Sequence, residues 1–253
     1  MEFWTITHLL TIIPSFIIMI FISLIMRYFL INKPLEKRMI PIKIISVIII
    51  IIEIGKQIYS ISIGYNLYHI PLHFCSIFLY VLPLMAFYKG KHLDHVRSLA
   101  CSTMTALLIG MLIIPSVIYS ESRIKSFFTD YLSFHTVFFH NLVIFSLFIT
   151  YFLDLHKPNG TKQETCFISL FGLGFVVLAA TFSHILQTNF SNFLYTTVGF
   201  MNDLVIRLKE IYGTTIINII YTISISILHI LLMILTNYIY LLICKLKPVK
   251  SNK

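Results

Sequence analysis

The sequence predicts an all-α fold, a polytopic helical membrane protein with about six to seven transmembrane helices. Of its 253 residues, 58% are hydrophobic, and the mean hydropathy is +0.89. Charged residues make up only 11%, against roughly 25% in ordinary soluble domains. Several apolar runs reach the length of about 18 residues or more that a bilayer core of about 30 Å requires.

The apolar runs place seven expected spans in a single integral membrane domain, residues 1–253. They lie at about 5–26, 40–62, 71–88, 98–119, 131–153, 165–187 and 214–244. The last run is long enough to tilt or to extend past the membrane. Segment 188–213 mixes charged and amide residues with aromatic and aliphatic ones, which is typical of an interfacial helix. A partly re-entrant segment is the alternative, and it would change the helix count.

The basic residues predict how the spans are oriented. Fourteen of the 19 lysines and arginines lie in 27–43, 89–97, 154–164 and the tail from 245, whereas the opposite loops hold only Arg123, Lys125, Arg207 and Lys209. Because cytoplasmic loops carry an excess of Lys and Arg, we expect the N-terminus outside and the C-terminus in the cytoplasm of a multi-pass cell-membrane protein. The net charge of +9 is thus a topology signal, and we expect no nucleic-acid partner.

Polar residues gather at the outer ends of four spans. They are Glu53, Lys56, Gln57 and Ser60 in the second span, His73 and Cys75 in the third, His135, His140 and Asn141 in the fifth, and His184 and Gln187 in the sixth. Ionisable groups inside spans are costly and mark candidate functional sites. The pattern therefore predicts one polar pocket that opens to the outer leaflet. The alternative is the ordinary polarity of membrane interfaces.

Glu53, Lys56 and Gln57 lie three and four residues apart, on one face of a helix. Their simplest role is a charge pair that neutralises itself in a low dielectric. The alternative is that Glu53 orients a histidine or a substrate group.

His69 and His73 have the four-residue spacing of helical metal ligands. Pro71 lies between them, and proline favours the first turn of a helix, so we expect His69 to precede the helix. The four cysteines are scattered without metal-type spacing. We therefore predict no metal and no cofactor.

Cys75 has two interpretations. A lone membrane cysteine is usually a small apolar filler. However, Cys75 lies near a helix N-terminus, where the dipole favours a thiolate, and histidines lie at a matching depth on another span. His73 and Cys75 are two residues apart, about 200° around a helix, so they cannot be partners. A base must come from His135 or His140.

These residues resemble a known family. The hexapeptide IPLHFC, residues 70–75, is similar to the Leu-Pro-Leu-His-Leu-Cys signature of the bacterial YwaF-type integral membrane proteins. Glu53, Pro115 and the histidine-bearing segment 133–142 fit the same pattern, and residues 192–195 resemble its late Asn-Tyr-Met-Tyr-like stretch. The proline and tryptophan expected after that stretch are missing. The resemblance covers roughly residues 45–240.

The resemblance implies a function, because eukaryotic relatives of the family include a multi-span phospholipid acyltransferase that uses cysteine and histidine. By similarity, Cys75 matches the nucleophile, His140 matches the base better than His135, and Asn192 matches the late asparagine. We therefore predict a lipid acyltransferase or lipid-ester hydrolase that acts on phospholipid or another acyl lipid through a thioester, with Asn141 as a candidate oxyanion donor. The alternatives are a non-catalytic transporter or lipid-binding protein that uses the same pocket, and an interaction protein or sensor.

Overall fold

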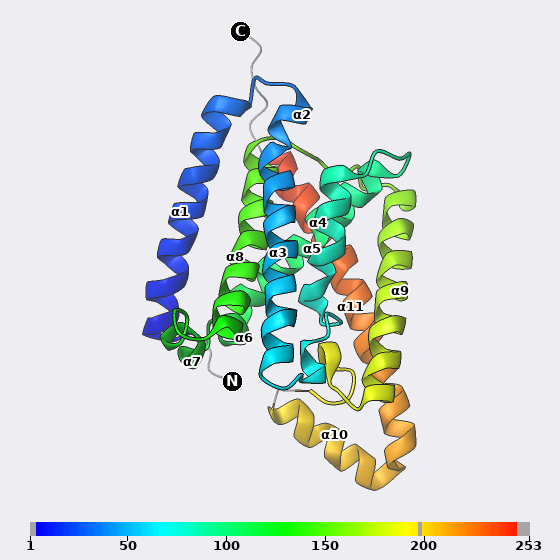
Figure 1. Cartoon of the computed structure of the whole chain (residues 1–253). Helices are drawn as coiled ribbons and strands as arrows, with labels where there is room; N and C mark the ends of the chain where they lie inside the picture. The colour runs from blue at the N-terminus through cyan, green and yellow to red at the C-terminus, as the bar shows by residue number, and fades with distance from the viewer. Residues whose placement is uncertain (1–3, 197–198, 247–253) are drawn as a thin grey trace.

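The computed structural model describes residues 4–196 and 199–246, which form a bundle of helices without any strand (Figure 1). The α-helices are α1 Ile6–Leu30, α2 Leu35–Arg38, α3 Ile40–Ser62, α4 Phe78–Phe87, α5 Leu93–Ile113, α6 Ser116–Tyr119, α7 Glu121–Lys125, α8 Tyr131–Phe152, α9 Lys162–Leu186, α10 Gly199–Tyr212 and α11 Thr214–Lys245. The 3₁₀ turns are η1 Leu67–His69, η2 Phe74–Ile77 and η3 Phe190–Asn192.

Five of the described helices are long and apolar enough to cross a membrane, namely α1, α5, α8, α9 and α11. The expected span 40–62 forms α3, which has 23 residues and carries Lys43, Glu53 and Lys56; it is not among the five. The expected span 71–88 contains a shorter apolar helical segment, Phe74–Phe87. The prediction of an all-α membrane fold is thus confirmed.

The third expected span begins differently from the prediction. Pro71 lies in an irregular stretch, which is followed by the 3₁₀ turn η2, and the α-helix proper starts only at Phe78. Ile70 has the extended ψ of 132° that a following proline favours. His73 and Cys75 therefore do not share a regular α-helix, and the angle of about 200° between them does not apply.

The fourth span is shifted toward the basic end of the bundle. Helix α5 runs from Leu93 to Ile113, whereas the sequence predicted 98–119. Ile114 adopts φ −132° and ψ 76° before Pro115, because the proline ring disfavours helical geometry in the preceding residue. The remaining residues form the short helices α6 and α7, which lead to α8.

Helix α5 is the centre of the bundle. Of its apolar window, 61% is buried, against 17% for α1 and for α11. Its buried face is rich in small residues, namely Ser98, Ala100, Ser102, Thr103 and Ala106. Small side chains allow the backbones of membrane helices to approach closely, and α5 accordingly packs along α11 and α4. In contrast, α1 packs on α8 at the edge of the bundle.

The predicted basic loops come together at one end of the bundle (upper end in Figure 1). There, Arg38 Nη1 donates to the carbonyl of Leu153 at 2.8 Å, and Arg27 donates to the carbonyl of Phe152. Cations at a helix C-terminus satisfy carbonyls that lack a partner within the helix. The two arginines therefore tie the α1–α3 connection to the end of α8. Which end faces the cytoplasm remains a prediction from the charge bias.

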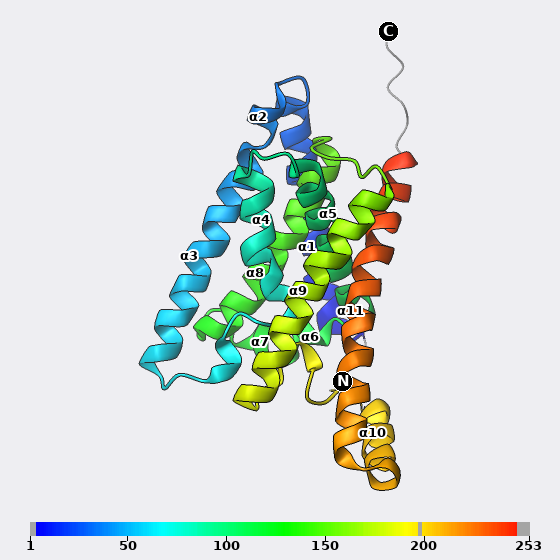
Figure 2. The same ribbon diagram turned by 90° about the vertical axis from the view of Figure 1, so that its right-hand side faces the viewer.

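The segment expected to be interfacial contains α10, which lies beyond the opposite end of the bundle (Figure 2). None of its residues is buried. It joins α11 through Gly213, whose φ of +90° is in the left-handed region that favours glycine. The interfacial position of this segment stays a prediction.

Candidate functional site

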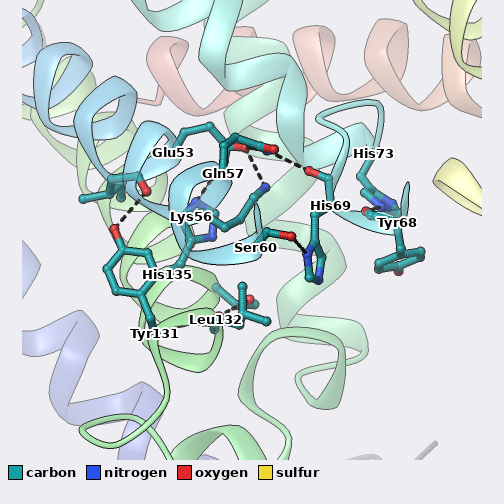
Figure 3. Close-up of polar contacts among 12 residues, drawn as sticks. Glu53, Lys56, Gln57, Ser60, Tyr68, His69, His73, Tyr131, Leu132 and His135 are labelled. Carbon is teal, nitrogen blue, oxygen red and sulfur yellow. Dashed lines mark hydrogen bonds and ion pairs between the residues drawn. The ribbon is translucent and has the colours of Figure 1, made fainter. Parts of the chain in front are cut away.

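A network of polar side chains occupies the end of the bundle opposite the basic loops (Figure 3). Its residues come from the last turns of α3, the connection 63–73 and the first turns of α8. On α3, Glu53, Lys56, Gln57 and Ser60 share one face because they are spaced by three, four and seven residues. The network therefore links three segments that are far apart in the sequence.

Glu53 is the centre of this network and is only 8% exposed. Its Oε1 lies 2.6 Å from Lys56 Nζ and accepts a hydrogen bond from Gln57 Nε2 at 2.7 Å. Its Oε2 lies 2.9 Å from His135 Nε2 on α8. The predicted charge pair is thus present. Glu53 also contacts a histidine, which was the alternative interpretation.

The contact between Glu53 and His135 is a close approach rather than an aligned hydrogen bond. Although the two atoms are 2.9 Å apart, the direction of the ring N–H misses the carboxylate oxygen, and His135 Nε2 has no aligned partner in the described residues. His135 is 7% exposed, and its ring stacks on Phe139 with centroids 5.4 Å apart. A small rotation of the ring would complete the hydrogen bond.

Gln57 and Ser60 fasten the connection 63–73 to α3. Gln57 Nε2 also donates to the carbonyl of His69 at 2.8 Å, and its Oε1 accepts from Tyr65 Oη at 2.7 Å. Ser60 Oγ forms a short hydrogen bond with His69 Nδ1. Burial lowers the pKa of His69, and the nearby charge of Lys56 lowers it further. As predicted, His69 precedes the helix.

Tyr131 fixes the start of α8 against α3. Its Oη donates to the carbonyl of Ile52 at 3.0 Å. A Cβ at Gly55 would lie 2.2 Å from that oxygen, so only glycine allows the two helices to approach this closely. Because His135 lies one turn beyond Tyr131, this close approach also places His135 beside Glu53.

Cys75 lies on the 3₁₀ turn η2 and is half-buried, with its thiol free. The connection 63–73, which leads into this turn, is held against α3 by the contacts of His69 with Gln57 and Ser60. In the described residues, no hydrogen bond joins Cys75 Sγ to His135 or His140. The described residues therefore contain no formed Cys–His pair.

His140 lies on the buried side of α8 and is 8% exposed. Its Nδ1 is 2.5 Å from the carbonyl of Thr136. A carbonyl can only accept, so Nδ1 carries the proton, and in the neutral ring Nε2 keeps its lone pair. His140 thus has the tautomer that a general base at Nε2 requires.

Two predicted site residues are engaged in structural contacts. His73 Nε2 donates to the carbonyl of Tyr68 at 2.9 Å, and its ring lies between those of Tyr68 and Phe190. Asn141 donates to the carbonyl of Val137 at 2.8 Å, and its Oδ1 accepts from Tyr119 Oη at 2.8 Å. Both the nitrogen and the oxygen of the Asn141 amide therefore already form hydrogen bonds within the protein.

The last two predicted residues lie apart from the Glu53 network. His184 is exposed near the end of α9 and binds Thr222 of α11, with Nε2 and Oγ1 3.0 Å apart. Asn192 is exposed in η3 with φ +65°, and its carbonyl accepts from Tyr221 Oη at 2.7 Å. In the described residues, neither of them contacts Glu53, Lys56 or Gln57.

Sequence reasoning missed some structural polar residues. Asn189 organises the loop before α10, because its Oδ1 accepts from the backbone N–H groups of Leu194 and Tyr195 and its Nδ2 donates to the carbonyl of Tyr195. At the basic end, Glu164 is 2% exposed and accepts from Asn237 Nδ2 at 2.7 Å. Its place at the start of an expected span was the available signal. No cluster of three or more potential metal ligands occurs in the described residues.

Comparison with known proteins identifies the chain at the level of its family. The sequence model of the TMEM164 family matches residues 3–235. Neither the curated proteins nor the solved structures include a match. The match spans α1 to α10 and most of α11, and thus includes the Glu53 network and Cys75. The chain therefore belongs to the TMEM164 family, a family of membrane proteins.

Proposed function

We propose that this protein is a lipid acyltransferase or lipid-ester hydrolase that works through a thioester at Cys75. His140 Nε2 takes the thiol proton, and the Cys75 thiolate attacks the ester carbonyl of an acyl lipid. The C–O bond breaks, and His140 returns the proton to the departing alcohol. A lipid hydroxyl or water then attacks the thioester, and the thiolate leaves and is reprotonated.

The observation that carries this proposal is the position of Cys75. Its half-buried thiol lies on the short turn η2, directly after the connection 63–73 that Gln57 and Ser60 fasten to α3 through His69. Lys56 is neutralised by Glu53 at 2.6 Å, so the pair can remain in a low-dielectric region. The resemblance of residues 70–75 to the YwaF-type signature points to the same cysteine.

His140 is the favoured base because its Nε2 is the unprotonated nitrogen of the neutral ring. A base also requires reach, so the thiol and Nε2 must approach when substrate binds. His135 is the other candidate, and Glu53 would then orient it as the third member of a triad. We leave Asn141 out of the mechanism because both ends of its amide are occupied.

The charge bias of the loops supports a position of the Glu53 network and Cys75 at the outer leaflet of a cell membrane. Phospholipid esters lie near the membrane interface, and the Glu53 network lies where α3 ends and α8 begins, at the end of the bundle opposite the basic loops (Figure 1). A membrane phospholipid or another acyl lipid is therefore the proposed substrate.

Turnover of a phospholipid with a fluorescent acyl chain tests the proposal, using the full chain in nanodiscs. We expect Cys75→Ser and His140→Ala each to lower turnover at least about 100-fold, the scale of a lost nucleophile or base. Cys166→Ala, which removes an exposed thiol on α9, is the matched control and should retain the wild-type rate. Wild-type turnover by Cys75→Ser would contradict the mechanism. Loss in His135→Ala with retention in His140→Ala would reassign the base.

A non-catalytic transporter or lipid-binding protein is the second candidate. The observation in its favour is that Glu53 makes its contacts with Lys56, Gln57 and His135 without Cys75. This function predicts that Glu53→Gln abolishes lipid binding or movement while Cys75→Ser leaves it unchanged. Measuring labelled-lipid binding in both variants separates the two functions.

A further inference from the structure

We propose that the groove between α9 and α11 binds the phosphate-bearing headgroup of the membrane lipid that accepts the acyl chain. The acceptor role rests on the proposed function. The groove has a volume of about 400 Å³ and is lined by His184, Thr215, Asn218, Ile219, Thr222 and Ile223. It lies at the same end of the bundle as the Glu53 network, where α9 ends and α11 begins (Figure 2).

The surroundings of the groove determine how a ligand reaches it. Helices α9 and α11 bury only 33% and 17% of their apolar windows, so most of their surface is available to lipid. Beside the groove, large apolar side chains are exposed, namely Phe182, Ile185, Ile216, Ile220 and Ile227. In a membrane, this apolar surface faces lipid. A ligand that crosses it to reach the polar lining residues therefore comes from the bilayer. A membrane lipid meets this condition, because its chains match the surround and its headgroup matches the lining.

The polar lining residues indicate the headgroup chemistry. Thr215 and Asn218 supply hydroxyl and amide donors, and His184 adds an imidazole. Thr222 Oγ1 donates weakly to the carbonyl of Phe193 at 3.5 Å and lies 3.0 Å from His184 Nε2. None of the six lining residues is acidic. Neutral donors without a competing carboxylate suit an anionic phosphate, which is the strongest hydrogen-bond acceptor of a phospholipid because it is charged.

A polar stripe on α11 connects the groove with the turn that carries Cys75. Thr215, Asn218, Thr222, Ser226 and His229 lie within an arc of about 80° on this helix, and they extend over about 21 Å along its axis. Over the same length, the other residues of α11 are isoleucine or leucine, except Tyr221 and Ser224. The stripe therefore provides polar contacts from the interface to the level of His229.

The inner end of the stripe reaches the candidate nucleophile. The ring of His229 lies 5.3 Å from that of Phe74 and stacks on that of Phe193 at 5.6 Å, centroid to centroid. Phe74 immediately precedes Cys75 in η2. A lipid held by its phosphate in the groove would thus extend its glycerol part toward this turn, while Glu53 and His135 lie on the α3 and α8 side.

The experiment separates the two half-reactions. Formation of the Cys75 thioester from a donor phospholipid is followed by intact-protein mass spectrometry without acceptor. Transfer is then measured at increasing concentrations of lysophospholipid in phosphatidylcholine nanodiscs.

Loss of a hydrogen bond to a charged phosphate weakens binding by about a factor of ten. We expect Asn218→Leu to raise the apparent KM for the acceptor about tenfold, with thioester formation unchanged. Ser224→Leu, an exposed change on α11 outside the groove, is the matched control and should match wild type.

The possible outcomes are distinct. If Asn218→Leu leaves the acceptor KM unchanged, or slows both half-reactions equally, the groove proposal is wrong. The proposed function still stands in that case if the thioester forms at Cys75. If no thioester forms in any variant, the proposed function fails, and photolabelling decides the groove alone. A diazirine lysophospholipid should label peptides of α9 and α11 in wild type and lose this labelling in Asn218→Leu. Labelling elsewhere, or equal competition by millimolar inorganic phosphate, would refute a lipid headgroup site.

Discussion

Removal of either partner of the ion pair between Glu53 and Lys56 should destabilise the protein strongly, because it leaves the other charge buried and unpaired. Their side chains are 10% and 13% exposed, and the charged atoms are 2.6 Å apart. Glu53→Gln keeps the shape and the hydrogen bond from Gln57 but leaves the Lys56 charge without a counter-ion. Breaking a buried pair by removing one partner costs about 3 to 5 kcal/mol, and the residual exposure of Lys56 favours the lower figure.

A loss of about 3 kcal/mol corresponds to a fall in Tm of roughly 6 to 12 °C for a chain of this size. Size-exclusion chromatography after stepwise heating in detergent measures this shift. The variant Lys56→Met should be destabilised similarly, because it leaves the Glu53 carboxylate unpaired. The double variant should lose at least about 1 kcal/mol less than the sum of the single changes, since the two groups interact directly.

An exposed pair provides the control for this double-mutant cycle. Lys125 and Glu121 are 3.5 Å apart with side chains 78% and 46% exposed. Solvent screens such pairs, so Glu121→Gln should cost less than about 1 kcal/mol. If Glu53→Gln melts within about 1 °C of wild type, or if the Glu53 and Lys56 effects simply add, the account of a coupled, buried pair is wrong.

Two further changes test the packing and the electrostatics. Gly55→Ala should lower the free energy of unfolding by about 1 to 3 kcal/mol, because the new Cβ would lie 2.2 Å from Tyr131 Oη. Gly174→Ala is the control: its Cβ would meet no atom within 4 Å, so this variant should melt at or above the wild-type temperature. Burial lowers the pKa of His156 to about 4. Between about pH 6.5 and pH 4, His156 is therefore protonated in the unfolded chain and neutral in the folded chain, which favours unfolding. The Tm of the wild type should therefore fall as the pH is lowered from about 6.5 to about 4. It should fall less steeply in His156→Gln, which retains a partner for Ser98. If Tm falls equally with pH in both proteins, this assignment is wrong.

The apolar runs predicted most helices, because a membrane-spanning helix must be long and apolar and therefore leaves a clear signal in sequence. Glu53, Lys56 and Gln57 were predicted to share a face, and periodicity alone places them together. The contact of Glu53 with His135 was left open, since it depends on how α3 packs against α8.

Backbone details were harder to predict. Pro71 gave the approximate start of the third span, but the 3₁₀ turn before Phe78 depends on contacts with other segments, such as Ser191 Oγ donating to the carbonyl of Leu72. The role of Asn189 depends on local loop geometry rather than on any periodic pattern. Asn192 was selected by resemblance, and in the structure its carbonyl accepts a hydrogen bond from Tyr221 Oη.

Intact-protein mass spectrometry tests the central claim most directly. The full chain is purified with native lipid and analysed with and without neutral hydroxylamine, beside Cys75→Ala and the Cys166→Ala control. The account predicts a fatty-acyl mass on wild type and on Cys166→Ala that hydroxylamine removes and that Cys75→Ala lacks. Unmodified wild-type protein after incubation with mixed phospholipids, or an acyl mass that persists in Cys75→Ala, would contradict a thioester at Cys75.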